Sequence, residues 1–209
     1  MAKDYYIGVF ETTIAQYNAL TGEGGTTDTK AKTSLTWNQI RGNALATAKI
    51  TSTGSGYVAK LNAKTGLYFD LPTEAMWEVA AHATGKPTDR FYFGDNPNDL
   101  PKYGKMTHGI VPVGCYIPNQ WGLYDVCQNA GEWCLDIVPF VSGATGYTIN
   151  TSGMSLTQTP AYSGTAPVWR GGRCGNGYEW AASSSRARDH NSCNYSDIFF
   201  GSRISLIVQ

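Results

Sequence analysis

Cysteine and histidine have the widest chemical repertoire in this 209-residue chain, because both can bind metal ions and a thiolate is also a nucleophile. The five cysteines are Cys115, Cys127, Cys134, Cys174 and Cys193. None of them forms a Cys-x-x-Cys pair, and their number is odd. The three histidines, His82, His108 and His190, form no His-x-x-x-His pair. We therefore expect reduced, partly buried thiols rather than a zinc site or a disulfide framework.

Other catalytic signatures are also missing from the sequence, which has no Gly-x-Ser-x-Gly motif, phosphate loop or paired catalytic carboxylates. The chain has 16 basic and 16 acidic residues and no run of like charge, which argues against nucleic acid as a partner. No stretch approaches the roughly 20 apolar residues of a membrane helix, and no signal peptide is recognisable in this chain. We expect one domain over residues 1–209, without membrane insertion.

The elements that must position any site are few, and the clearest is a helix that begins at the N-cap Thr73 and ends at Gly85. The residues at helical spacing that should form its inner face are Ala75, Met76, Val79, Ala80 and Ala83. With 24 glycines, 12% aromatic residues and only 15% charged residues, the composition is typical of a loop-rich fold pinned by aromatic packing.

Shorter elements are expected on either side of this helix. Residues 5–13 alternate as an opening strand, residues 14–21 should form a helix, and residues 204–209 should form a closing strand. Ser34 is the expected cap of a short helix that turns Trp37 and Ile40 inward. The sequence thus predicts an α+β protein with two principal helices, near 14–21 and 73–84, and small mixed or antiparallel sheets.

One segment, from Arg170 to Arg203, has boundaries rich in Gly, Arg and Phe and a polar interior without helical or strand period. The glycines at its ends, Gly171, Gly172 and Gly201, should permit backbone turns that a side chain would obstruct. Arg170 and Arg203 should bind carbonyls or carboxylates below the surface. Such a segment can change between its ends without disturbing the core.

Four segments in order resemble one family. "IGVFETTIAQYNAL", "YFDLPTEAMWEVAAHATG", "NQWGLYDVCQNAGEWCLD" and "WRGG" through "FFGSRISL" are similar to the motifs of the formylglycine-generating-enzyme (sulfatase-modifying factor) domain. The resemblance covers nearly the whole chain and implies a variant of the C-type lectin fold with adjacent first and last strands. The aromatic residues expected in its core are Trp77, Trp121, Tyr124 and Trp133.

The enzymes of this family use two cysteines, and the resemblance places them at Asn176 and Ala181 of this chain. Cys174 lies two residues too early, which on a strand displaces the thiol by about 6–7 Å. A copper-thiolate site needs both soft ligands together. The three-histidine iron site of a related branch and the sugar-binding motifs of C-type lectins are absent as well. We therefore expect no catalysis.

The family also implies a calcium site, whose residues here are Asp125, Gln128, Ala130 and Glu132. Two alternatives remain open for Glu132, namely a structural calcium ion or hydrogen bonds from backbone amides or an arginine. Gln128 stands where the family has glycine, and Gly131 stands where it has an aromatic residue.

A second group with this fold resembles the chain at its C-terminal segment, namely the variable proteins of diversity-generating retroelements. Random replacement of adenines in Asn codons reaches most amino acids but never Gln, Met, Glu, Lys or Trp. Of the 25 residues from Arg173 to Asp197, only Glu179 and Trp180 belong to that set. Tyr, Asn and Ser on a rigid frame also suit a binding surface.

The resemblance thus implies a non-catalytic ligand-binding protein with a variable region at about 170–203. The expected ligand-binding residues are Arg173, Gly175, Asn176, Tyr178, Arg188, Asp189, His190, Ser192, Asn194, Tyr195 and Asp197. A protein or glycan on a cell surface would be the partner, and a phage tail or bacterial surface the location. The alternatives are a divergent or degenerate enzyme of the formylglycine type and a carbohydrate-binding module of fixed specificity.

Overall fold

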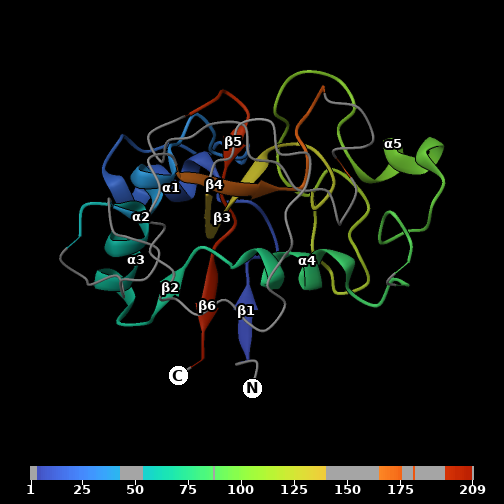
Figure 1. Ribbon diagram of the computed structural model, residues 1–209. Helices are drawn as coiled ribbons and strands as arrows, with labels where there is room; N and C mark the ends of the chain where they lie inside the picture. Colours follow the sequence, from blue (N-terminus) through green and yellow to red (C-terminus); the bar gives the residue numbers. More distant parts are fainter. Residues whose placement is uncertain are drawn as a thin grey trace.

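The first and last strands of the chain lie side by side in one small sheet. The computed structural model describes residues 4–42, 54–86, 88–139, 165–175, 181 and 196–208. Strand β1 (Tyr5–Ile7) pairs antiparallel with β6 (Ser205–Ile207), whose other edge pairs with β2 (Phe69–Asp70). Both termini therefore lie at the same end of the molecule (Figure 1). The predicted adjacency of the first and last strands is confirmed.

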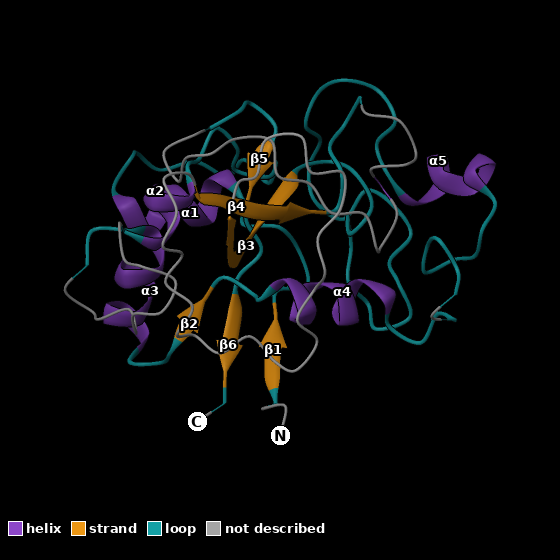
Figure 2. Cartoon of the chain, viewed as in Figure 1, coloured by secondary structure: helices purple, strands orange, loops and turns teal. Residues whose placement is uncertain are grey.

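A second three-stranded sheet lies at the centre of the fold (Figure 2). Its middle strand, β3 (Gly131–Pro139), pairs antiparallel with β4 (Thr165–Arg170) and parallel with β5 (Phe200–Gly201). Trp133 lies opposite Trp169 in this register. The sheet thus joins the aromatic segment predicted near residue 130 to both boundaries of the polar C-terminal segment.

Two helices begin with the same threonine-glutamine device. Helix α1 (Ile14–Thr21) starts after Thr13, and α2 (Trp37–Arg41) starts after Thr36. In each case the threonine hydroxyl accepts from the backbone N–H three residues on, and the Gln side chain at that position accepts from the threonine N–H. The expected capping role of Ser34 is wrong, because Ser34 lies at φ +60° in the preceding turn.

Helix α4 (Glu74–His82) begins as predicted, with the Thr73 hydroxyl accepting from the N–H of Met76 at 3.1 Å. Its inner face differs from the expected one. Glu74, Trp77 and Ala81 are buried, whereas Val79 is 54% exposed. On the buried face, Glu74 accepts a hydrogen bond from Arg170 of β4 at 3.0 Å.

Three helical elements were not predicted from the sequence. They are α3 (Tyr57–Thr65), the 3₁₀ turn η1 (Pro97–Asp99) and α5 (Leu100–Tyr103). Helix α3 packs beside α1, where Tyr57 stacks on Tyr17 with ring centroids 5.2 Å apart. Its apolar period is too short and too interrupted by Lys and Asn to be distinguished from a loop.

Among the described residues, the core consists of two aromatic clusters, one around Trp133 and Trp169 and the other around Trp77. Burial of Trp77 and Trp133 confirms two of the four expected core aromatics, and Tyr124 is partly buried. The prediction for Trp121 is wrong, because half of this residue is exposed. It lies in a tight turn whose N–H groups bond to a buried side chain, so the turn directs the indole outward.

Candidate functional site

The polar C-terminal segment begins where β4 ends, at two glycines with left-handed backbone. Gly171 has φ +90° and Gly172 has φ +74°. A Cβ atom on Gly171 would also lie 3.2 Å from the ring of Trp77. The Gly171 carbonyl accepts from the N–H of Gln128 at 2.6 Å. Glycine is therefore required here both for the turn and for the close approach.

Arg170 anchors this entry to helix α4. Its Nη1 donates to Glu74 Oε1 at 3.0 Å, and its Nη2 donates to Glu78 Oε2 at 2.7 Å. The guanidinium carbon lies 5.3 Å from the centroid of the Trp77 ring. The arginine is wholly buried, so the expectation that it binds carboxylates below the surface is confirmed.

Arg203 anchors the other end of the segment. Its Nη2 donates to Glu132 Oε1 at 2.7 Å, and its Nε lies 3.0 Å from Glu132 Oε2. The remaining protons go to backbone carbonyls, because Nη1 bonds to Gly8 and Val9 and Nη2 also bonds to Tyr124. Burial alone would lower the pKa of Arg203, but the charge and hydrogen bonds of Glu132, together with the charges of Glu11 and Asp125, outweigh it and raise that pKa. This expected anchor is confirmed too.

Buried carboxylates gather below the exit of the segment, and Glu11 is the one that sequence reasoning missed. Its Oε2 accepts from the side chain of Asn129 at 2.6 Å, and its Oε1 accepts from the N–H of Ala130 at 2.8 Å. Burial raises the pKa of Glu11 well above its usual value, and the charges of Glu132 and Asp125 raise it further. The only signal in the sequence was a Glu within the residues expected to form the opening strand.

The calcium set expected from the resemblance comprises Asp125, Gln128, Ala130 and Glu132. All four residues are buried, and Asp125 Oδ1 has no hydrogen-bond partner among the described residues. Both oxygens of Glu132, however, accept bonds from Arg203, whose positive charge already compensates this carboxylate. Asp125 Oδ2 accepts from the N–H of Gly114 at 2.7 Å. Of the two alternatives for Glu132, the structure has the arginine.

The cysteine positions of the family's oxidases do not form a thiol pair here. The second position is Ala181, which is buried and whose carbonyl accepts from the Cys127 thiol at 3.3 Å. Cys174 is also buried, and its backbone N–H donates to the carbonyl of Asn129 at 3.0 Å. Burial raises the pKa of the Cys174 thiol, which disfavours the thiolate that a soft metal needs. A copper-thiolate centre does not fit these residues.

Arg173 and Asp197, at the two ends of the expected binding set, bond to each other. Arg173 Nη1 donates to Asp197 Oδ2 at 2.8 Å, and the two side chains are 26% and 22% exposed. The Arg173 guanidinium also lies over the rings of Phe199 and Phe200, with centroids at 5.3 and 5.8 Å. This contact closes the base of the segment, and both residues are partly buried rather than fully exposed.

Gly175 is the third described member of that set and lies against an unpredicted neighbour. It has φ +87°, and a Cβ atom there would come within 2.5 Å of the imidazole of His108. The predicted binding residues that lie outside the described residues are Asn176, Tyr178, Arg188, Asp189, His190, Ser192, Asn194 and Tyr195.

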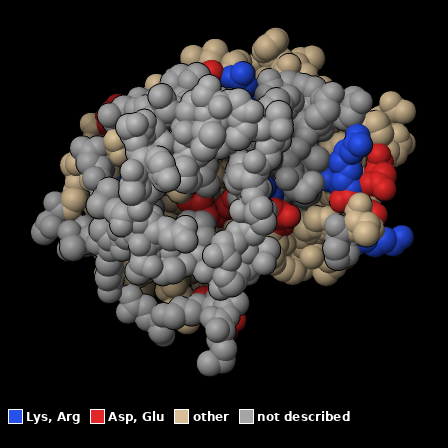
Figure 3. Space-filling view, in the orientation of Figure 1, with Lys and Arg blue, Asp and Glu red and all other residues tan. Residues whose placement is uncertain are grey.

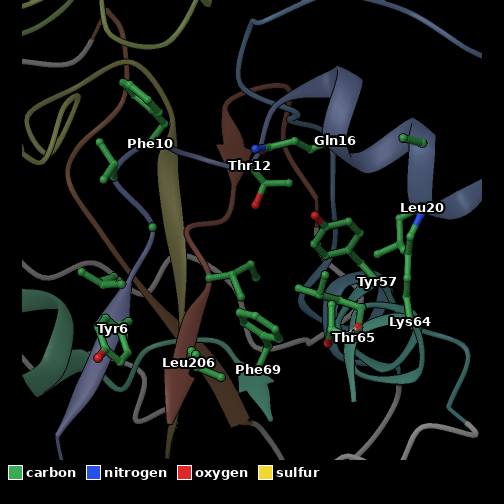
Figure 4. Close-up of a pocket in the computed structure, with 16 residues that line it drawn as sticks. Tyr6, Phe10, Thr12, Gln16, Leu20, Tyr57, Lys64, Thr65, Phe69 and Leu206 are labelled. Carbon is green, nitrogen blue, oxygen red and sulfur yellow. Dashed lines mark hydrogen bonds between the residues drawn. The ribbon is translucent and has the colours of Figure 1, made fainter. Parts of the chain in front are cut away.

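A groove of about 610 Å³ lies elsewhere, between the sheet of β1 and the helices α1 and α3 (Figure 4). Tyr6, Leu206 and Phe69 form one row across the three strands on its floor. None of its lining residues is His, Cys, Asp or Glu, and the single charged one is Lys64. The groove therefore offers mainly apolar contact.

Charges are mixed on the described surface in Figure 3, where basic and acidic side chains adjoin on the flank near α5. Lys102 and Asp99 form an ion pair in that region, with Nζ and Oδ1 2.6 Å apart. Among the helices that the structure describes, none is long and apolar enough to span a bilayer.

Comparison with known proteins agrees with this architecture. The family profile described as the sulfatase-modifying factor enzyme 1-like domain matches residues 1–204. The formylglycine-generating enzyme of Thermomonospora curvata is 36% identical over 84 residues, which are 32% of this chain and 26% of that protein. The serine/threonine-protein kinase pkn1 of Chlamydia pneumoniae is 36% identical over 102 residues, 49% of this chain and 15% of that protein. The chain thus spans about a quarter or less of these relatives.

Solved structures share the fold at low identity. Treponema denticola variable protein 1 has a TM-score of 0.70 and 21% identity, over 97% of this chain and 84% of that one. The U1 variant of Major Tropism Determinant has a TM-score of 0.51 and 17% identity, over 98% of this chain and 51% of that one. The C-type-lectin-like α+β fold is confirmed, and the chain belongs to the family of sulfatase-modifying factor enzyme 1-like, or formylglycine-generating-enzyme-type, domains.

Proposed function

We propose that this protein is a non-catalytic ligand-binding protein, in which a retroelement diversifies the C-terminal segment at about 170–203 and so varies the binding specificity. The scaffold supplies a preorganised frame, and the exposed side chains of the segment supply recognition. The ligand is a protein or glycan on a cell surface, and the domain is presented on a phage tail or a bacterial surface.

The anchoring of the segment is the observation that carries this proposal. Arg170 bonds to carboxylates of α4, and Arg203 bonds to Glu132 and to carbonyls near the N-terminus. These buried contacts join the two boundaries to parts of the chain outside the segment. Substitutions between the boundaries can then alter a surface while the frame retains its ion pairs and its aromatic core.

Composition and structural likeness support the same function. From Arg173 to Asp197, only two of 25 residues are unreachable from an Asn codon through changes at adenines. Two proteins with this fold carry names that refer to variation or tropism, Treponema denticola variable protein 1 and Major Tropism Determinant. The eleven predicted binding positions are the part of this chain to which we assign that variation.

Catalysis of the formylglycine type is not proposed, although a formylglycine-generating enzyme is among the relatives. The position of its second cysteine is the buried Ala181, and the thiol of Cys174 is buried with a raised pKa. Neither residue supplies the accessible pair of thiolates that copper(I) chemistry requires.

The proposal is tested first in the genome. A near-copy of the last hundred or so bases of the gene, beside a reverse transcriptase and differing mainly at adenines, is expected. Its absence, together with an unchanged segment in independent isolates, would favour a carbohydrate-binding module of fixed specificity. Correlated changes at positions other than the eleven would instead show that the binding set is misplaced.

A biochemical test uses the intact chain. If the segment is a variable surface, serine substitutions at Asn176, Asp189 and Asn194 should each change the free energy of unfolding by no more than about 0.5 kcal/mol. Loss of folding on these substitutions would make the residues structural and would overturn the variable surface.

A further inference from the structure

A small ledge, formed by the exposed His108 and Ile198 and the partly buried Phe199, lies beside Gly175 and Asp197 of the proposed binding set. His108 is exposed and its ring centroid lies 6.0 Å from that of Phe199. Ile198 precedes Phe199 in a turn and is 64% exposed. None of the three belongs to the eleven positions to which we assign variation, so Ile198 and Phe199 count with the constant frame although they lie within the segment at 170–203.

The loop that carries His108 is fixed to the same buried residue as the start of the segment. The side-chain oxygen of Asn129 accepts from the N–H of Val111 at 3.1 Å, and its backbone carbonyl accepts from the N–H of Cys174 at 3.0 Å. Asn129 is wholly buried and donates to Glu11 at 2.6 Å. Asn129 therefore fixes the distance between the loop that carries His108 and the start of the C-terminal segment.

His108, on that loop, is in direct contact with Gly175, at the start of the segment. The space that a Cβ atom of Gly175 would need is filled by the imidazole, with Cε1 and Nδ1 each 2.5 Å from its ideal position. A ligand that reaches the residues after Gly175 consequently meets the exposed ring of His108 at the same time.

Phe199 is held from the other side by the ion pair at the base of the segment. The Arg173 guanidinium lies 5.3 Å from the Phe199 centroid and bonds to Asp197 at 2.8 Å. Asp197 Oδ1 also accepts from the N–H of Phe199 at 3.3 Å. The aromatic ring is thus positioned before any ligand arrives, which lowers the entropic cost of binding.

We propose that this ledge is a constant anchor of the binding face, which receives an apolar or aromatic side chain of a protein ligand. The inference rests on the proposed function and deepens it. The ledge makes the same contact with each ligand, and the variable positions select among ligands. Ile198 is exposed and next in sequence to Phe199, which packs near the exposed imidazole of His108, so the ledge offers apolar and aromatic surface, and polar variable side chains suit its rim. The ledge is continuous with the proposed binding segment through Gly175 and Asp197.

The experiment uses the full 209-residue chain on the surface of yeast, randomised at the eight binding positions outside the described residues. Lysozyme serves as the probe for selection. In the selected clones, Ile198→Ser and His108→Ala are each introduced, and Leu67→Ser is the matched control. Leu67 is another exposed apolar residue, 52% exposed, in the turn between α3 and β2.

We expect Ile198→Ser to weaken lysozyme binding tenfold or more in most clones, His108→Ala to weaken it severalfold, and Leu67→Ser to change it less than twofold. Display level and melting temperature should stay unchanged in all three variants. Affinities within twofold of the parent for both ledge variants would overturn the anchor and leave the proposed function intact. A well-displayed library that yields no lysozyme binder would contradict a protein-binding anchor at the ledge, whereas the genomic search tests the proposed function separately.

Discussion

Arg203 and Glu132 form a buried ion pair, with Nη2 and Oε1 2.7 Å apart, at the point where three strands meet. Glu132 on β3 lies opposite Arg170 on β4 and beside Gly201 on β5. The entry and exit of the C-terminal segment therefore flank one carboxylate in one sheet. Both boundaries of the segment pair with the same strand, β3, which explains how the scaffold can hold them in register.

Arg203→Ala should destabilise the domain by about 3–5 kcal/mol, because removal of one partner leaves a buried charge uncompensated. The loss should be at the upper end of this range, because the charge of the guanidinium also stabilises the ionised carboxylates of Glu11 and Asp125. Chemical denaturation at neutral pH measures the loss. The control is Lys64→Ala, an exposed cation whose removal should cost no more than about 0.5 kcal/mol. Equal midpoints for the two variants would contradict the anchoring role.

A pH dependence should arise at Asp136, which is buried and accepts from the N–H of Glu74 at 2.6 Å. Burial raises its pKa to about 6, against a partial opposing effect of Arg170. Because the folded-state pKa exceeds the unfolded one, the folded state holds the extra proton between about pH 4 and 6. Stability at this residue is thus greatest below that window and falls as pH rises through it.

Asp136→Asn keeps an acceptor oxygen for Glu74 but removes the titration. The free energy of unfolding of this variant, relative to the wild type, should therefore rise by about 2 kcal/mol between pH 4.5 and 7.5. Urea unfolding at several pH values measures this difference. A constant difference across the range would mean that Asp136 does not titrate there.

The fold was predictable because the sequence carries several strong signals and each of them is local. The Thr73 cap, the opening and closing strands and the four ordered motifs are each readable without tertiary context. Trp121 shows the limit of prediction from local sequence. Its exposure depends on Asn119, whose side chain bonds to carbonyls of α4 and to two N–H groups of the turn. No local pattern reveals contacts to residues 38 and 39 positions away.

The candidate site was predictable at its anchors and not at its neighbours. Arg170 and Arg203 were identifiable as charged residues beside glycine turns in a family motif. Glu11, Asn129 and His108 were not, because each acts on residues more than 60 positions away in the chain. Their roles follow from the packing of three loops on one another, which has no period and no spacing in the sequence.

Gly175→Ala should cost about 1–2 kcal/mol from the left-handed backbone alone, with a further cost for displacing the His108 ring. The matched control is Gly22→Ala, since Gly22 has φ +83° but nothing within 4 Å of the added Cβ. Thermal unfolding should therefore show a larger loss for position 175 than for position 22. In a His108→Ala background the difference should disappear. Equal losses in the wild-type background would show that His108 does not occupy that space.

The Arg173–Asp197 contact should appear as an energetic coupling between two positions of the proposed variable surface. Each single alanine variant removes this ion pair from the remaining partner, so the double variant should cost less than the sum of the singles, by about 1 kcal/mol. The comparison pair is Lys102–Asp99, with side chains 63% and 37% exposed, for which we expect a smaller coupling.

Denaturation of the four members of each cycle measures the two couplings. If natural variants of this gene exist, the residues at 173 and 197 should also change together, in contrast to freely varying positions in the segment. Additive effects in the cycle would mean that the two side chains do not depend on each other. Arg173 and Asp197 could then vary independently, like the other positions of the proposed binding set.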